Sequence, residues 1–377
     1  MFLSIGARIE VNIEAFNAVE TVGNLTKHRR APMVVPTNAG YRLIYVPAVS
    51  GESIANAYQR NLVELAKHTY KVQGRNPPLT EWDLRHEFSK FMDNKHLIPE
   101  LAEIVKEATS KKQEKKVSED IVEIKHKFEK TAVEKSIVAD VGGFLYAEDL
   151  PVKRTSRVYF GYLLPTYDTI ETMAIEAQYH ARQMPAETIA SEARRTEQEA
   201  EGEEKRRRAA QMIYYVEVAS AVYGLTAALD ISNIGKTSLV RVEDAVSSEE
   251  RHRRIKVAIG ALAALFSGSG FGAKLSRFTP VKKVVSAVAL ISNPAPFMVT
   301  PPQYPNYIED SILRAANYCK TLQKIGLTPT VTAIAMGGQP KEAECVQVVK
   351  ANTIEELFNK VLEKTEELAE SRPTAKG

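Results

Sequence analysis

The stretch with the clearest binding chemistry is a turn that leads from an expected strand into an expected helix. Residues 46–58 read VPAVSGESIANAY, which places Ser50, Gly51 and Ser53 at the helix start. The first turn of a helix has unpaired N–H groups and the positive end of the helix dipole, so phosphate groups bind there readily. Serine at this position is also a common N-cap. The pattern therefore leaves phosphate binding and plain capping open.

A basic cluster precedes this turn. It consists of Asn24, Lys27, His28, Arg29 and Arg30, between two expected strands. Clustered cationic side chains attract phosphate, although charged loops are also common on surfaces that bind nothing. We expect these five residues to contribute to a phosphate site, with a solvated loop as the alternative.

A third candidate is the segment QYHAR at residues 178–182. Alternate side chains of a strand share a face, which would place Gln178, His180 and Arg182 together. Imidazole and guanidinium groups suit phosphate binding and, in principle, acid–base cleavage of RNA. Because no partner base is identifiable, we assign these residues to binding and keep a catalytic role of His180 as the alternative.

A glycine-rich loop supplies the fourth candidate. Residues 267–280 read SGSGFGAKLSRFTP, after an expected helix and before an expected strand. This order is the reverse of a dinucleotide fingerprint, and the spacing does not fit a phosphate loop of NTPases. Gly270, Lys274 and Arg277 remain as a basic segment whose backbone can approach a polyanion closely, with a plain connector as the alternative.

The composition is that of a globular protein. Of 377 residues, 44% are hydrophobic and 26% are charged, and the formal net charge of +3 does not by itself imply nucleic acid. Cys319 and Cys345 have no paired spacing, so we expect buried free thiols in a reducing cytoplasm. The sequence predicts no metal site, no cofactor, no export signal and no membrane span.

Strands and helices alternate along the chain around inserted material. Residues 3–13 alternate in polarity like a half-exposed strand, and we expect further strands at 41–46, 211–229, 281–291 and 330–336. Apolar residues at helical spacing predict helices at 53–67, 306–325 and 353–368, and another helix that begins near Ser247 or Ser248. The charged stretches 106–130 and 191–208 are expected to be an exposed helix and a mobile or linker segment.

A projecting hairpin is predicted for residues 142–165, which read GGFLYAEDLPVKRTSRVYFGYLLP. Two aromatic segments flank a basic stretch, and hairpins commonly carry such polar residues at the turn. We therefore expect Lys153, Arg154 and Arg157 at an exposed tip and assign both arginines to RNA binding.

Four of these segments together resemble one protein family. They are VPAVSGESIANAY, QYHAR, RAAQMIYYVEVASAVYGLTAALDISNIG (208–235) and GSGFGAKLSRFTP, in family order over most of the chain. They are similar to the repeating, crRNA-binding backbone subunit of the archaeal type I-A CRISPR Cascade complex, in the DevR group. The charged stretches match nothing in that pattern.

The resemblance implies an α+β fold with an RRM-like (ferredoxin-like) antiparallel-sheet core and large helical and hairpin insertions. We expect this core to comprise residues 1–74 with 209–350, a helical insertion at 75–141, a thumb-like hairpin with the charged segment at 142–208, and a C-terminal helix and tail at 351–377.

The resemblance also implies a non-catalytic, cytoplasmic protein of antiviral interference. Copies of such a subunit form a helical filament along CRISPR RNA, bind its phosphate backbone and leave bases free to pair with target DNA, together with other Cascade subunits and without a membrane. Base readout through the aromatic motif of RRM domains is not expected. The alternative is an RRM-type endoribonuclease that processes CRISPR repeat RNA through His180.

Overall fold

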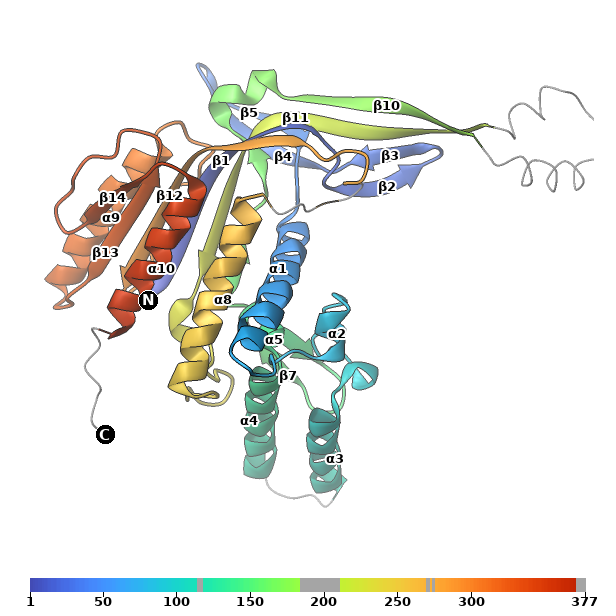
Figure 1. Cartoon of the computed structure of the whole chain (residues 1–377), viewed down its shortest axis with the longest axis vertical. Coiled ribbons are helices and arrows are strands. Elements are labelled where there is room, and N and C mark those ends of the chain that lie inside the picture. Colours follow the sequence, from blue (N-terminus) through green and yellow to red (C-terminus); the bar gives the residue numbers. More distant parts are fainter. Residues whose placement is uncertain (114–117, 184–210, 269–271, 273–274, 371–377) are drawn as a thin grey trace, which may run out of the picture.

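The computed structural model describes residues 1–113, 118–183, 211–268, 272 and 275–370. The fold is mixed α+β, as expected, and is built on one large sheet with the path β14–β13–β12–β1–β11–β3–β2 (Figure 1). Strands β8, β9 and β10 join this sheet through β11. Two small two-stranded sheets, β4–β5 and β6–β7, lie outside it.

The bounds of the elements follow the order of the chain. The strands are β1 (Phe2–Glu14), β2 (Ala18–Val22), β3 (Leu25–His28), β4 (Arg30–Thr37), β5 (Gly40–Pro47), β6 (Phe144–Tyr146), β7 (Val152–Arg154), β8 (Val158–Phe160), β9 (Leu164–Pro165), β10 (Ala174–Gln183), β11 (Gln211–Leu229), β12 (Val281–Asn293), β13 (Thr330–Met336) and β14 (Gln347–Ala351). The α-helices are α1 (Gly51–Val72), α2 (Glu81–Leu84), α3 (Pro99–Gln113), α4 (Ser118–Lys135), α5 (Ile137–Gly142), α8 (Ser248–Phe266), α9 (Tyr307–Lys324) and α10 (Ile354–Glu370).

Four antiparallel strands form the centre of the sheet, in the order β12–β1–β11–β10. Helix α1 lies in sequence between β1 and the β10–β11 pair, and α8 connects β11 to β12. Alternate apolar residues of β1, Leu3, Ile5 and Ala7, are buried in the largest hydrophobic core. Helices α1, α8 and α10 lie side by side against this face of the sheet (Figure 1).

The other face of β1 is more covered than its polarity predicts. Ser4 is fully buried and accepts a hydrogen bond from the Val299 N–H (3.2 Å), and Arg8 donates to the Pro302 carbonyl (2.8 Å). A bulge between Val11 and Glu14 also turns Ile13 outward, with φ +57° and 58% exposure. The expectation of a simple half-exposed strand is therefore wrong at both places.

A second hydrophobic core lies at the end of the molecule that holds α3 and α4 (Figure 1). Leu101 and Ile104 of α3 pack there with Phe128 of α4 and with Phe144 and Tyr146 of β6. The stretch 106–130, expected to be one charged helix, is instead divided between α3 and α4. The stretch 191–208 lies outside the described residues.

The predicted hairpin at 142–165 has a different structure from the one expected. Only β6 and β7 pair as a hairpin, and β8 and β9 run along β11 in the main sheet. The Arg154 side chain is 0% exposed because it binds the carboxylates of Asp140 (2.5 Å) and Glu129 (3.3 Å). Arg157 is 7% exposed. Placing both arginines at an exposed RNA-binding tip was therefore wrong, whereas Lys153 is exposed.

The hairpin that does project from the molecule is formed by β10 and β11 (Figure 1). Ten residue pairs, from Ala174↔Ser220 to Gln183↔Gln211, run along it without a register shift. A long uninterrupted antiparallel pair extends well beyond the helices because each residue adds about 3.4 Å.

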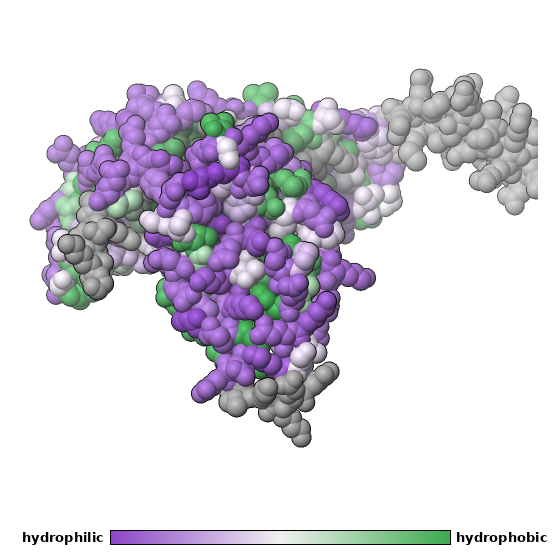
Figure 2. All heavy atoms as spheres, turned by 60° about the horizontal axis from the view of Figure 1, so that its bottom comes forward, coloured by the Kyte–Doolittle hydropathy of each residue, from purple (hydrophilic) through white to green (hydrophobic). Residues whose placement is uncertain are grey.

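Two further features complete the fold. Cys319 of α9 and Cys345 are joined in a disulfide, which corrects the expectation of free thiols. None of the described helices is long and apolar enough to cross a membrane. On the face drawn in Figure 2, hydrophilic residues cover most of the surface and apolar residues gather only in small patches.

Candidate nucleic-acid interface

Residues 14–17, at the end of β1, bring the separate sequence candidates together. The side-chain oxygen of Asn17 accepts two hydrogen bonds, from Nε of Arg29 (3.0 Å) and from the backbone N–H of Ser50 (2.9 Å). The backbone is tied as well, since the Arg29 N–H donates to the Asn17 carbonyl (2.9 Å). The basic cluster and the start of α1 therefore meet at one side chain.

The helix start has the geometry of a capped N-terminus. Ser50 is the N-cap, and its hydroxyl accepts the Ser53 N–H (3.4 Å). The Ser50 hydroxyl also lies 3.2 Å from that of Ser53. Two donors of this turn are thus used within the protein. Gly51 is required because a Cβ there would lie 2.6 Å from the Phe160 carbonyl oxygen.

The cations of the basic cluster differ in their partners. Lys27 pairs with Glu20 (3.3 Å), and Arg30 pairs with Glu217 of β11 (3.1 Å). Both side chains of the first pair and the Arg30 side chain of the second are exposed, and ion pairs open to solvent are weak, so a phosphate can compete with the carboxylates. Within the described part of the chain, no carboxylate pairs with Arg29, whose guanidinium is fixed by Asn17.

The cluster surrounds a surface hollow of about 350 Å³. Its lining consists of Val19, Glu20, Lys27, His28, Arg29, Arg30 and Glu217. Asn24 is exposed nearby, and its carbonyl accepts the Tyr215 N–H (2.8 Å). The hollow thus places several cations next to one another, as a phosphate site requires.

His28 is the member of the cluster that is not exposed. Its side chain is 0% exposed, and Nε2 lies 2.8 Å from Oε1 of the equally buried Glu14. Burial lowers the pKa of His28, but the close contact with the negatively charged Glu14 carboxylate outweighs burial and raises the pKa above its usual value. His28 therefore contacts a carboxylate of its own protein, and the expectation that it faces a ligand is wrong.

His180 lies on β10 as predicted, in an aromatic setting. Its ring stacks on Tyr214 (5.2 Å between centroids) and contacts Phe278 edge-on (5.4 Å). Nε2 is buried without a hydrogen-bond partner among the described residues. Gln178 lies two residues before it on the same face of the strand, and the side chain of Arg182 lies outside the described residues.

The glycine-rich loop approaches the same region. Arg277 donates to the Tyr214 hydroxyl and lies over its ring at 5.6 Å. Phe278 packs in one cluster with Ala15 and Val216. Gly272 has φ +108°, and a Cβ there would lie 2.7 Å from Phe16, so this close approach requires glycine. Gly270 and Lys274 lie outside the described residues.

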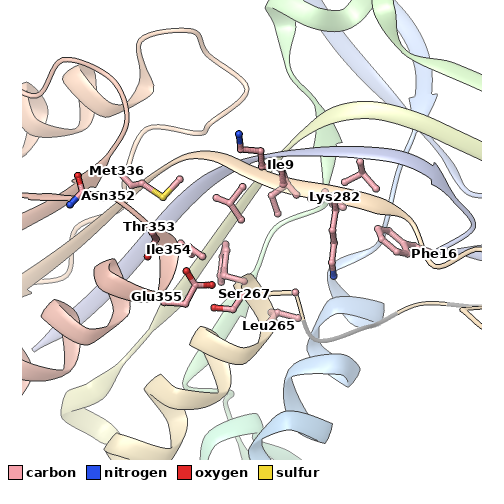
Figure 3. Close-up of a pocket in the computed structure, with 16 residues that line it drawn as sticks. Ile9, Phe16, Leu265, Ser267, Lys282, Met336, Asn352, Thr353, Ile354 and Glu355 are labelled. Atoms are coloured by element: carbon pink, nitrogen blue, oxygen red, sulfur yellow. The ribbon is translucent and has the colours of Figure 1, made fainter.

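A hollow of about 360 Å³ adjoins this loop (Figure 3). Leu265 of α8, Ile354 of α10, Ile9 of β1 and Phe16 give it apolar walls, and the aliphatic chain of Lys282 extends along it. Burial lowers the pKa of Lys282. The C-terminal end of α8 and the N-terminal end of α10 both line this hollow. In the described part of the chain, no group of three or more His, Cys, Asp or Glu side chains could hold a metal ion.

Comparison with known proteins identifies the family. The family model described as CRISPR-associated negative auto-regulator DevR/Csa2 matches residues 5–312, which is most of the chain. The chain belongs to the DevR/Csa2 family. The resemblance seen in the sequence is therefore confirmed.

Relatives within and near this family are similar over most of their length. The CRISPR-associated aCascade subunit Cas7/Csa2 2 of Saccharolobus solfataricus is 36% identical over 83% of this chain and 86% of its own. A CRISPR-associated protein Cas7/Cst2/DevR of Methanocaldococcus jannaschii is 27% identical over 97% of this chain and 100% of its own. A solved chain of a CRISPR RNA-guided surveillance complex, pre-nicking, aligns with a TM-score of 0.47 at 12% identity, covering 97% of this chain and 100% of that chain.

Several residues that shape this candidate interface were not found from the sequence. They are Glu14, Phe16, Asn17, Tyr214, Glu217 and Phe278. Glu14 is directed inward only because the bulge shifts the alternation of β1, and a bulge leaves no clear mark in a single sequence. Aromatic residues beside an expected RNA-binding strand were the one available signal for Tyr214 and Phe278.

Proposed function

We propose that this DevR/Csa2 chain is a non-catalytic subunit that binds the phosphate backbone of CRISPR RNA. Copies of it would assemble in a helical filament along the RNA, with other Cascade subunits, and leave bases free to pair with target DNA. Membership of the family supports this proposal, as does the relative at 36% identity that is named an aCascade subunit.

The observation that carries the proposal is the junction at Asn17. The amide of one residue holds Arg29 and the start of α1 within hydrogen-bonding distance of the same atom. A guanidinium fixed in place loses little conformational freedom when a phosphate binds it, so binding is stronger than to a mobile side chain. The adjacent hollow adds Lys27 and Arg30.

The proposed core is RRM-like. Its support is the strand order β12–β1–β11–β10 with α1 and α8 packed together on one face, which is the order 4-1-3-2 of a ferredoxin-like βαββαβ unit. The second hydrophobic core supports a helical insertion within residues 75–141. Strands β8 to β10 pair with β11, so parts of the stretch 142–208 contribute to the main sheet.

We assign the thumb-like role to the β10–β11 hairpin in place of residues 142–165. It projects from the molecule and carries Tyr179, 56% exposed, beside Tyr215. A projecting hairpin with exposed aromatic rings suits contact with a neighbouring subunit or with unstacked bases.

Binding of RNA and its salt dependence test the proposal. The full chain is titrated with labelled CRISPR RNA and with a scrambled sequence of equal length at several salt concentrations. Steep loss of affinity with salt and equal affinity for both sequences are expected, since phosphate contacts release counterions and carry no sequence information. The combined change of Lys27, Arg29 and Arg30 to Ala should reduce affinity and flatten the salt dependence.

A matched triple variant controls for total charge. Replacing Lys71, Lys153 and Lys324, which lie on α1, β7 and α9, removes the same charge elsewhere. Equal loss of affinity in both triple variants, or binding of one sequence only, would contradict the proposal.

The second candidate is cleavage of CRISPR repeat RNA by His180. The unpartnered, buried Nε2 of His180 motivates it, but no hydrogen-bonded base or acid accompanies this ring in the described structure. Incubation of the purified protein with repeat RNA distinguishes the two functions. Intact RNA is expected, whereas defined products that disappear with His180→Ala would establish the nuclease.

A further inference from the structure

Both ring nitrogens of His28 face groups that only accept hydrogen bonds. Nε2 lies 2.8 Å from the Glu14 carboxylate, close enough for an ion pair but without the alignment of a hydrogen bond, and Nδ1 lies 2.7 Å from the Arg29 carbonyl. A neutral imidazole carries one N–H, so it can satisfy only one of these two acceptors. The surroundings therefore select the imidazolium.

Both oxygens of the Glu14 carboxylate accept hydrogen bonds from the protein. Its Oε2 accepts the Phe16 N–H (2.6 Å), and its Oε1 accepts the Tyr223 hydroxyl (2.8 Å). Since the side chains of Glu14 and His28 are both 0% exposed, removal of one charge leaves the other buried and unpaired.

This ion pair sits at the corner between β3 and β4. The His28 N–H donates to Oε2 of Glu217 (2.8 Å), and the other oxygen of Glu217 pairs with Arg30 (3.1 Å). On the next residue, Arg29 is bound to Asn17. The corner is therefore fixed to β1 through Glu14 and to β11 through Glu217.

We infer that His28 is a positioning residue of the RNA site: its imidazolium, buried against Glu14, fixes the β3–β4 corner and so holds Arg29 and Arg30 in place for the RNA backbone. This inference rests on the proposed function. The ionisable groups around the ring are Glu14 on β1, Tyr223 and Glu217 on β11, and Arg29 and Arg30 on its own segment. Deprotonation of His28 removes the positive charge beside Glu14 and loosens the corner.

The sign of the pH dependence follows from this pairing. His28 with a raised pKa contributes binding and stability in its charged form, below that pKa. The contribution is lost as pH rises through the pKa. Affinity for RNA should therefore fall on going from about pH 6 to about pH 9, where lysine and arginine keep their charge.

Two measurements on the full chain test the inference. Histidine-labelled protein without RNA is titrated by NMR, where His28 should show an imidazolium that persists above the usual range of histidine. Affinity for oligoadenylate, whose bases do not titrate between about pH 6 and about pH 9, is measured at constant ionic strength. Wild-type affinity should fall several-fold, with the same midpoint as the NMR signal.

The variant His28→Gln retains a donor toward Glu14 but has no titrating group, so its affinity should be lower and independent of pH. His252→Gln, which removes a partly exposed histidine of α8 outside the candidate site, should keep the wild-type pH profile. If His28→Gln fails to fold, the wild-type protein alone tests the inference, because the midpoint of the affinity change must agree with the midpoint of the His28 NMR titration. A neutral His28 at pH 6, or constant affinity while His28 titrates, overturns the inference. Absence of RNA binding at every pH instead refutes the proposed function, and the NMR titration still reports on the ion pair.

Discussion

At the scale of single residues, the neighbours of a side chain decide its role more than its type does. Lys153 and Arg154 are adjacent on β7, yet Lys153 is exposed and Arg154 is fully buried with Asp140 and Glu129. In the basic cluster, His28 is likewise buried while Arg30 is exposed. A cationic residue is therefore a candidate ligand only once its partners are known.

Asn17 provides the test at this scale. Asn17→Ala removes the acceptor shared by Arg29 and Ser50, and we expect a roughly fivefold loss of RNA affinity, equivalent to about 1 kcal/mol. Asn12→Ala is the matched control, because Asn12 lies near the end of β1, a short distance before Asn17 in the chain, and its side-chain amide donates to Glu10 of the same strand (3.1 Å). Equal affinities of the two variants in a filter-binding titration would remove Asn17 from the site.

At the scale of elements, the start of α1 depends on its contact with β8. Helix α1 begins where Gly51 lies against the Phe160 carbonyl. Tyr58, about two turns further along α1, contacts the Phe160 ring (5.4 Å between centroids). The helix can approach the strand this closely only without a Cβ at the first position. The packing of α1 against β8 therefore sets the position of the helix start in the candidate site.

Gly51→Ala tests this contact. The added methyl group forces α1 and β8 apart, and we expect a loss of about 1–3 kcal/mol in the free energy of unfolding. Gly161→Ala is the control, since its nearest contact would be an ordinary 3.5 Å from the Thr226 carbonyl oxygen, and a change within about 0.5 kcal/mol is expected. Denaturant unfolding monitored by circular dichroism compares the two, and equal stability would contradict this account of the helix start.

At the scale of the whole molecule, a buried ionic network joins the two hydrophobic cores. Asp140 of α5 binds Arg154 of β7 (2.5 Å), Arg254 of α8 (2.9 Å) and the Gly235 N–H (3.0 Å). Arg254 also donates to the Val133 carbonyl at the end of α4 (2.6 Å). Elements from both cores therefore contribute side chains to one buried ionic network. Removal of one charged side chain leaves the remaining buried charges without a counter-charge.

Asp140→Asn should uncouple the cores. The substitution preserves shape but leaves Arg154 and Arg254 short of one negative charge, at a cost of about 3 kcal/mol. We expect thermal unfolding followed by calorimetry to change from one transition to two, with the α3–α4 region unfolding first. Arg241→Ala, which breaks exposed pairs with Glu123 and Glu243, is the control and should leave one transition near the wild-type midpoint. One unchanged transition in Asp140→Asn would show that the cores are coupled by other contacts.

Much of the element order was predictable from the sequence. The strands at 211–229 and 330–336 have the predicted bounds, and Ser247 caps α8 as expected. These features are local, because apolar periodicity and capping act over a few neighbouring residues. The family was also evident in the sequence, since its motifs are contiguous segments.

Only the tertiary structure decided which of the cations are exposed and which segments meet. Arg154 is buried by carboxylates 14 and 25 residues away, and Arg29 and Ser50 converge on Asn17 from 12 and 33 residues away. The strand β14 and the bulge at Ile13 depend likewise on pairing with distant strands. Burial and partner choice are set by contacts between segments far apart in the chain, so local periodicity contains no information about them.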